Sequence, residues 1–398
     1  MSEHRLEVAD VFRAYESDFF AQWGHVIDPQ QRKAFEAIRD CRTAALGGHV
    51  DQCDACGHLS ISYNSCRNRH CPKCQALSRA KWLAEKEAEL LPVGYFHVVF
   101  TLPQQIGGLA LQNAREIYRI LFRAVSETLL TIAADPKHLG AAVGFLAVLH
   151  TWGQNLHLHP HVHCVVPGGG ISPDGARWIG CRKSFFLPVR VLSRLFRKKF
   201  LIYLRKAHRE GKLRFHGGMA SLAKPAAFAS LCRQAGRIEW VVYAKPPFGG
   251  PEHVLKYLAR YTHRVAISNR RLLSMENGRV TFEWKDYAGG NQSRTMTLDA
   301  VEFIRRFLLH ILPGGFVRIR QFGFLSNRAR RIKLALCRSL LPVAPATGVT
   351  VSVSLNPKIE DRDRAQCPAC KTGRLIPIEI IPSAARPLAP RPLRQDSS

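Results

Sequence analysis

Two histidines, His161 and His163, stand two residues apart in an otherwise apolar stretch near the middle of the chain. Side chains on a strand alternate between its faces, so these two imidazoles would lie on the same face. Two imidazoles in that arrangement can chelate one divalent cation, and we predict a metal site here. His157 and His159 precede the pair, but Pro160 interrupts the strand between them, so their part in the site stays open.

Two tyrosines, Tyr257 and Tyr261, stand four residues apart in residues 252–264, with His253 one turn earlier. On a helix this spacing places all three side chains on one face. A parallel row of cations lies alongside them, formed by Lys256, Arg260 and Arg264. Tyrosines at this spacing can also line the edge of a core, but the row of cations favours a chemical role.

These parts suit strand transfer at a phosphodiester. Tyrosine is a covalent nucleophile that is weak at its free pKa of about 10. A divalent ion would make the phosphorus more electrophilic, and the cations would favour the phenolate and absorb charge on the phosphate. The product is a covalent phosphotyrosine that keeps the bond energy for rejoining, which agrees with the absence of a phosphate-binding P-loop motif from the sequence.

A second concentration of metal ligands lies in residues 41–76, which contain six cysteines and three histidines. Two Cys-x-x-Cys pairs, Cys53/Cys56 and Cys71/Cys74, are separated by fourteen residues. Because zinc takes four such ligands in a tetrahedron, we predict that these pairs share one structural Zn²⁺. The remaining candidates either complete a second zinc site or support the first, namely Cys41, His49, Cys66 and His70.

A further Cys-x-x-Cys pair, Cys367 and Cys370, stands near the end of the chain without a second pair nearby. Half a ligand set is weak evidence for a metal site. The sequence therefore assigns this pair no role.

The chain has 398 residues, of which 46% are hydrophobic, and a formal net charge of +28. Its hydrophobic content is that of a globular protein with room for two or three domains. Its charge predicts a polyanionic partner, because cations that neutralise phosphates release condensed counterions. Charge alone does not separate DNA from RNA.

Positive charge is concentrated in two segments without acids, residues 175–209 and 303–359. In the second, basic residues alternate with Phe316, Phe322 and Phe324, which suits a single strand because cations follow phosphates and rings stack on bases. We predict DNA contacts from Arg318, Arg320, Arg328, Arg330, Arg331 and Lys333. The alternative is a solvated basic face over core phenylalanines.

Alternating strands and helices predict an α+β or α/β core. Strands are expected at residues 95–100, at 145–150 and from about His161, because proline is tolerated at the first residue of a strand. A helix is expected at residues 251–264, where Pro251 suits the first turn.

Composition divides the chain into four regions. They are a helical segment (1–40), a zinc-binding domain with a linking helix (41–91), a nuclease domain (92–340) and a Pro-rich, loosely ordered tail (341–398). Acids among the apolar residues of the first twenty positions are not typical of a signal peptide, and no apolar stretch is long enough to span a membrane, so we expect neither. We therefore expect a cytoplasmic protein whose cysteines bind metal rather than form disulfides.

Together these motifs resemble the rolling-circle transposases of insertion sequence family 91. Asn64-Ser-Cys-Arg-Asn-Arg-His-Cys-Pro-Lys-Cys74 resembles the zinc-binding domain of that family. His159-Pro160-His161-Val162-His163 resembles the metal motif of the HUH endonucleases, and Tyr257-x-x-x-Tyr261 resembles the two-tyrosine motif. The similarity extends over about residues 35–340.

The resemblance implies an HUH-endonuclease-like central antiparallel sheet with flanking helices, in which the sheet carries the histidines and a helix presents the tyrosines. It implies Mg²⁺ or Mn²⁺ as the catalytic ion and nicking of single-stranded transposon ends and target to a 5′-phosphotyrosine with a free 3′-OH. The protein would act at the bacterial nucleoid. The superfamily completes its metal site with a third ligand, for which the candidates are His253, His159, Gln154 and His97.

Three rival functions remain at this point. A replication initiator or relaxase would use the same chemistry, and a non-catalytic zinc-ribbon DNA-binding protein would leave both tyrosines structural. A zinc hydrolase would need a carboxylate ligand, which the stretch after His163 does not offer. The sequence leaves the oligomeric state open.

Overall fold

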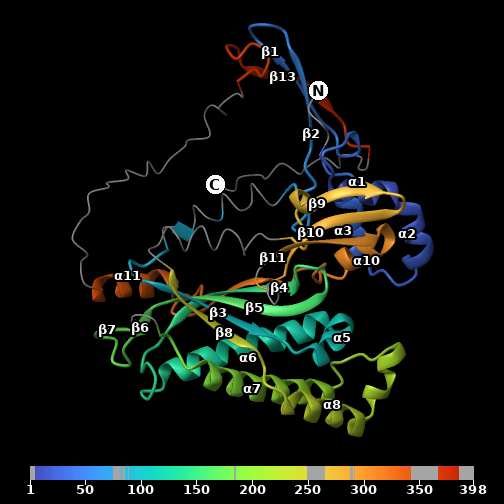
Figure 1. Ribbon diagram of the computed structural model, residues 1–398. Helices are drawn as coiled ribbons and strands as arrows, with labels where there is room; N and C mark the ends of the chain where they lie inside the picture. Colours follow the sequence, from blue (N-terminus) through green and yellow to red (C-terminus); the bar gives the residue numbers. More distant parts are fainter. Residues whose placement is uncertain are drawn as a thin grey trace, which may run out of the picture.

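The computed structural model describes residues 5–74, 82, 86–87, 89–182, 185–248, 265–286, 290, 292–341 and 366–384. Its centre is a five-stranded antiparallel sheet in the order β12-β4-β5-β3-β8 (Figure 1). The strands are β3 (Tyr95–Thr101), β4 (Gly144–Trp152), β5 (Leu158–Pro167), β8 (Val242–Phe248) and β12 (Ile319–Gly323). The predicted α+β class with a central antiparallel sheet is confirmed.

Strand β5 begins at Leu158, three residues before the expected start at His161. Pro160 lies opposite the point where the ladder to β4 shifts, between His150 and Trp152. A residue without an N–H is tolerated at such an irregularity because the regular bond is already missing there. The Pro160 carbonyl still accepts a hydrogen bond from Leu102 N at 3.0 Å.

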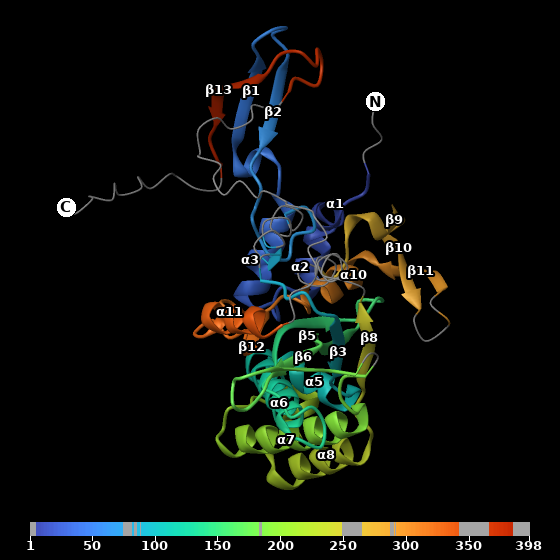
Figure 2. The ribbon, with the colours of Figure 1, turned by 90° about the vertical axis from the view of Figure 1, so that its left-hand side faces the viewer.

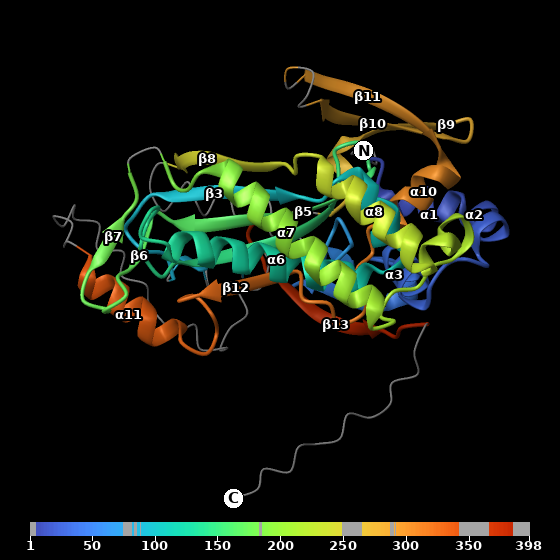
Figure 3. The ribbon, with the colours of Figure 1, turned by 90° about the horizontal axis from the view of Figure 1, so that it is seen from below.

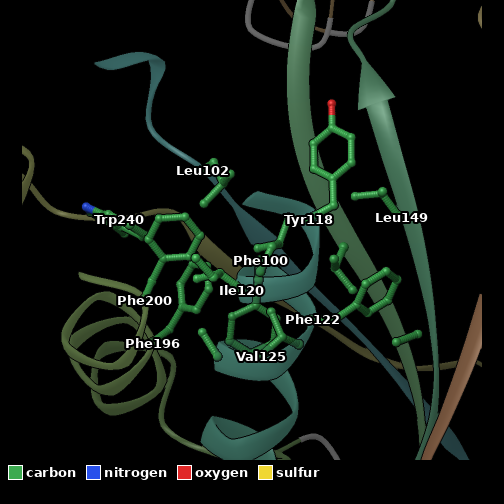
Figure 4. Close-up of a cluster of buried hydrophobic side chains, with 14 of the residues drawn as sticks. Phe100, Leu102, Tyr118, Ile120, Phe122, Val125, Leu149, Phe196, Phe200 and Trp240 are labelled. Atoms are coloured by element: carbon green, nitrogen blue, oxygen red, sulfur yellow. The ribbon is translucent and has the colours of Figure 1, made fainter. Parts of the chain in front are cut away.

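Helices cover one face of the central sheet (Figures 1 and 3). They are α5 (Gln104–Gln112), α6 (Ala114–Ala134), α7 (Val189–Arg209) and α8 (Pro225–Arg237). In α7, apolar residues recur at helical spacing and bury Phe196 and Phe200 beside Phe100 of β3 (Figure 4). Phe196 meets both Phe100 and Trp240 with ring centroids 5.1 Å apart. Each ring so buried stabilises the fold by about 1.5–3 kcal/mol.

A second core joins the N-terminal helices to a segment between residues 266 and 311. Helices α1 (Val8–Ala14), α2 (Glu16–Trp23) and α3 (Pro29–Arg39) pack with α10 (Ala300–Leu308) and with a sheet of β9 (Leu272–Glu276), β10 (Arg279–Asp286) and β11 (Gln292–Asp299). Phe12 stacks on Phe35 at 4.6 Å and meets Phe307 edge-on at 5.4 Å. The predicted helical segment is thus present, and it is fastened to residues far along the sequence.

A third part projects from the body of the molecule (Figures 1 and 2). It is a three-stranded sheet of β1 (Gly48–Cys53), β2 (Leu59–Tyr63) and β13 (Leu375–Ile381), with β1 in the middle. Residues 366–384 belong to the segment expected to be a loosely ordered tail. Strand β13 was not predicted from the sequence, because its partner, β1, lies at the other end of the chain.

The remaining elements are short. They are β6 (Gly169–Ile171), β7 (Trp178–Gly180), α11 (Arg330–Leu340) and three 3₁₀ turns at Ala44–Leu46, Gly217–Ala223 and Asn269–Arg271. Among the described helices, none combines the length and the apolar character needed to cross a membrane.

Candidate functional site

Three imidazoles gather on the central sheet: His150 from β4, and His161 and His163 from β5. One ring nitrogen from each residue lies within 4.8 Å of the others. His150 pairs with His161 across the two strands, and His163 follows on the same face. Val162 points the other way, into the core under the helices, so the histidine cluster lies on the face that α5–α8 do not cover.

Neighbouring groups fix the orientation of two of these rings. His161 Nδ1 donates to the carbonyl oxygen of His159 at 2.6 Å, so the lone pair of the neutral ring lies on Nε2. His163 Nδ1 lies 2.8 Å from His97 Nε2, and the two rings stack with centroids 5.0 Å apart. Donation from His163 to His97 would likewise leave the lone pair on His163 Nε2, the form that binds a metal.

His97 is itself a buried, neutral ring. Burial, together with the nearby charges of Lys245 and His161, lowers the pKa of His97 to about 3. A neutral His97 can accept the hydrogen bond from His163, which a protonated ring could not.

Trp152 joins the histidine cluster to the second core. Its ring stacks on His150 with centroids 4.8 Å apart and an interplanar angle of 16°. Trp152 also shares a core with Leu156, Ala266 and Ile267. The cluster therefore lies where the central sheet meets the N-terminal helices and their partners.

His150 is the ligand candidate that sequence reasoning missed. Of the four candidates for a third ligand, His159 is exposed and its nitrogens lie outside the histidine group. His97 is within hydrogen-bond distance of His163 Nδ1, and the backbone carbonyl of Gln154 accepts a hydrogen bond from Arg271. The available signal was a histidine at the end of a predicted strand, but the β4/β5 register was needed to use it.

Several predicted residues lie outside the described part of the chain. They are the tyrosines and their neighbours, namely His253, Lys256, Tyr257, Arg260, Tyr261 and Arg264. Their assignment stays a prediction from the sequence.

Eight cysteines form two groups of four, in a combination that differs from the expected one. The first group, Cys41, Cys66, Cys71 and Cys74, has all its sulfur atoms within 4.8 Å of one another. Cys74 Sγ lies 3.6 Å from both Cys41 Sγ and Cys66 Sγ. Sulfurs at about 2.3 Å from a central zinc would be about 3.8 Å apart, so this spacing fits a zinc tetrahedron.

The second group corrects the predicted pairing. Cys53 and Cys56 were expected to share an ion with Cys71 and Cys74, but they lie instead against Cys367 and Cys370. The physical reason is the β1/β2 hairpin, which carries Cys53 and Cys56 to its tip, whereas the first group lies near its base. Strand β13 then brings the C-terminal pair alongside.

The two predicted histidines of this region belong to neither cysteine group. His49 Nε2 lies 3.2 Å from Asp51 Oδ2 on β1. His70 is buried, its Nε2 accepts from Leu312 N at 3.3 Å, and burial lowers its pKa to about 3. The adjacent Arg69 donates to the carbonyl of Pro313 at 3.0 Å. The loop of the first cysteine group is thus fastened to the segment that leads into β12.

The basic C-terminal segment agrees with the alternative of a solvated face over core rings. Phe316 and Phe324 are 4% and 5% exposed, so neither is a surface on which bases stack. Arg318 is 7% exposed, and burial lowers its pKa to about 10. A side chain in that position does not fit the expected DNA contact, because it faces the protein interior.

The other predicted DNA-binding residues differ in exposure. The Arg320 guanidinium lies 4.3 Å from the centre of the Phe122 ring, and Arg330 pairs with Glu89 at 3.2 Å. Arg328 and Arg331 are exposed, and Lys333 is half-buried. Among the described residues, no hydrogen bond or ion pair engages the side chains of these last three.

Comparisons with known proteins agree with the two kinds of site. Residues 11–102 match the family model described as "Transposase zinc-binding domain", and residues 144–333 match the one described as "Putative transposase". The first match contains the first cysteine group, and the second contains the histidine cluster. Cys367 and Cys370 lie outside both.

Two curated relatives match over most of the chain. "Putative transposase y4qJ" of Sinorhizobium fredii (strain NBRC 101917 / NGR234) is 56% identical over 397 residues, which cover 97% of this chain and 98% of the relative. "Transposase for insertion sequence element IS801" of Pseudomonas savastanoi pv. phaseolicola is 28% identical over 314 residues, which cover 77% and 74%. No solved structure matches the chain.

Proposed function

Because the chain belongs to the transposases of insertion sequence family 91, we propose that it nicks and rejoins single-stranded DNA through a 5′-phosphotyrosine in rolling-circle transposition. The observation that carries this proposal is the cluster of His150, His161 and His163. Three ligands leave coordination positions for a substrate, as catalytic metal sites do, whereas a set of four cysteines closes its ion off.

The donor set fits a divalent cation, with His150, His161 and His163 as its ligands. All three are nitrogen donors, so Mn²⁺ suits them better than Mg²⁺, which prefers oxygen ligands. When bound, the ion would withdraw charge from the scissile phosphate. His97 and the His159 carbonyl would hold two of the rings in the orientation that this requires.

We assign the nucleophile to Tyr257 or Tyr261 from the sequence pattern. The phenol gives up its proton, its oxygen forms a bond to the 5′-phosphorus, and the bond from phosphorus to the 3′ oxygen breaks. That oxygen takes up a proton and leaves as the free 3′-OH, which reverses the step when a 3′-OH returns. Lys256 and Arg260 would favour the phenolate. A second tyrosine lets the enzyme hold donor and target strands in turn.

Covalent geometry permits this assignment. Tyr261 precedes Val265 by four residues, a connection that spans at most about 14 Å. Ala266 and Ile267, which follow Val265, share a core with Trp152, the ring that stacks on His150. The length of this connection is compatible with a position of Tyr261 near the histidine cluster.

Mass spectrometry of a trapped protein–oligonucleotide adduct tests the proposal. With Mn²⁺ and a single-stranded oligonucleotide that carries an element end, we expect DNA attached to Tyr257 or Tyr261. The double variant Tyr257→Phe/Tyr261→Phe and the variant His161→Ala should lose the adduct and keep DNA binding. Tyr243→Phe is the matched control, because Tyr243 is exposed and lies on the histidine face through its pairing with Val99.

Three outcomes would contradict the proposal. Full nicking by the double variant would remove both tyrosines from the nucleophile's role, and an adduct on Tyr243 would reassign it. Binding without any adduct would favour a non-catalytic zinc-ribbon protein.

A further inference from the structure

Four cysteines from opposite ends of the chain meet at the tip of the projecting sheet. Cys53 Sγ lies 3.7 Å from Cys370 Sγ, and Cys56 Sγ lies 3.8 Å from Cys367 Sγ, although the partners stand 317 and 311 residues apart in the sequence. The four sulfurs all lie within 4.8 Å of one another. These separations match the edge of about 3.8 Å that a zinc tetrathiolate requires, and they far exceed the roughly 2.05 Å of a disulfide.

The two pairs lie on two copies of the same turn. In Cys53-Asp-Ala-Cys-Gly57, the fifth residue donates its N–H to the carbonyl of the first at 3.0 Å, and in Cys367-Pro-Ala-Cys-Lys371 it does so at 2.9 Å. Gly57 and Lys371 both adopt a left-handed conformation, with φ of 73° and 58°. A non-glycine residue in that conformation is uncommon, so Lys371 indicates that the turn itself is required.

Backbone N–H groups point at the sulfur atoms. Ala55 N donates to Cys53 Sγ at 3.4 Å, and Gly373 N donates to Cys370 Sγ at 3.3 Å. Such bonds favour the charged thiolate, which is the form that binds zinc. The same kind of bond is present in the first cysteine group, where Asn68 N donates to Cys66 Sγ at 3.5 Å.

Hydrogen bonds also hold the two turns together. Asp54 N donates to the Arg374 carbonyl at 3.1 Å, and Arg374 N donates to Asp54 Oδ1 at 2.8 Å. A Cβ on Gly373 would collide with Cys53 Sγ and Asp54 Oδ1, so only glycine allows this approach. Behind the turns, β13 pairs with β1 along its whole length, from Cys53 opposite Leu375 to Gly48 opposite Ile381.

The projecting sheet has little core of its own. Leu59 and Ile61 of β2 are 57% and 58% exposed, and Ile380 of β13 is 81% exposed. A strand that buries so little apolar surface gains little from packing. A metal ion that binds only the folded form would supply the missing free energy.

We propose that Cys53, Cys56, Cys367 and Cys370 bind a second structural Zn²⁺, which fastens the C-terminal residues 366–384 to the N-terminal zinc-binding domain. With four thiolate ligands the ion has no open position, so the site stabilises and does no chemistry. The zinc-binding domain is thus completed by residues at the other end of the chain. This proposal does not depend on the nicking chemistry.

Zinc stoichiometry tests the proposal on the full-length protein. Native mass spectrometry should find one zinc ion fewer in Cys367→Ser/Cys370→Ser than in the wild-type chain, whatever the histidine cluster holds. Cys181→Ser is the control, since Cys181 belongs to neither cysteine group and the variant should keep the wild-type count. Hydrogen exchange should show β13 amides protected in the wild type and the control, and unprotected in the double variant.

A wild-type count of one zinc would overturn the proposal without any variant, and so would the same zinc count in the wild type and the double variant. Gly373→Ala keeps every cysteine and disturbs only the approach of the two turns. We expect it to release one zinc ion to a chelator at least tenfold faster than wild type. Unchanged release from a folded Gly373→Ala protein would also count against the site.

Discussion

The histidine cluster and the two cysteine groups bring similar numbers of ligands together under different structural conditions. The histidines stand on neighbouring strands of a sheet whose other face is a large core, so the fold positions them before any metal arrives. The cysteines stand on loops and on a small projecting sheet, where the ion has to supply part of the folding free energy. The difference teaches that the ligand set proposed for catalysis is preformed by the sheet, whereas the sets proposed as structural would be completed by their metal.

The largest expected effect is on stability, where loss of a cysteine from a zinc site should cost more than loss of a histidine from the histidine cluster. Cys66→Ser should lose one zinc ion and lower the free energy of unfolding by several kcal/mol, because the first cysteine group lies in the second core with Cys41 and Cys71 buried. His161→Ala removes a half-buried ligand from the sheet and should cost less than about 1 kcal/mol. Denaturant unfolding, with the zinc content measured in parallel, checks both values.

Equal losses in the two variants would break the comparison. They would mean that the histidine cluster also supports the fold. The control is His157→Ala, which changes an exposed histidine outside the group and should leave both stability and zinc content as they are.

The features predicted correctly from the sequence are those that depend on the geometry of a single strand or helix. The alternation of a strand was enough to place His161 and His163 on one face, and helical spacing was enough to find the N-terminal helices. His150 was missed because its approach to His161 depends on the register between two strands. No periodicity within either strand contains that information.

The cysteines show the same limit. Pairing Cys53/Cys56 with Cys71/Cys74 assumed that ligands close in sequence are close in space. The β1/β2 hairpin separates those pairs, and β13 replaces the missing partner from more than 300 residues away. Basic residues beside phenylalanines suggested a binding surface, but Phe316 and Phe324 are buried, and sequence composition does not report the direction of a side chain.

A smaller effect is expected on the Mn²⁺ affinity of the histidine cluster when His97 is replaced. His97→Ala should weaken Mn²⁺ binding about 10- to 100-fold, because His163 loses the partner that orients its ring. His97→Gln, which keeps an acceptor, should recover part of the affinity. Electron paramagnetic resonance of free Mn²⁺ measures the binding directly, independently of catalysis.

A merely structural role for His97 predicts a different result. Both variants would then lose stability to a similar degree and bind Mn²⁺ equally well once folded. Unchanged affinity in folded His97→Ala would remove His97 from the site.

The smallest effect concerns a buried histidine that belongs to no ligand group. His310 donates from Nε2 to the Leu156 carbonyl at 3.1 Å, and burial lowers its pKa from 6.5 to about 4. The unfolded chain therefore binds a proton that the folded protein resists, so stability is constant above about pH 7 and falls as the pH drops through 6.5 towards 4. At about 1.36 kcal/mol per unit, this residue should cost about 2 kcal/mol by pH 5. His310→Asn should flatten that part of the pH profile of the unfolding free energy.

The zinc sites, which also titrate, are common to both proteins, so the difference between the two profiles isolates His310. An identical slope in both would show that His310 is not the group that titrates, and the decline in acid would then belong to the metal ligands or to the other buried histidines, His70 and His97.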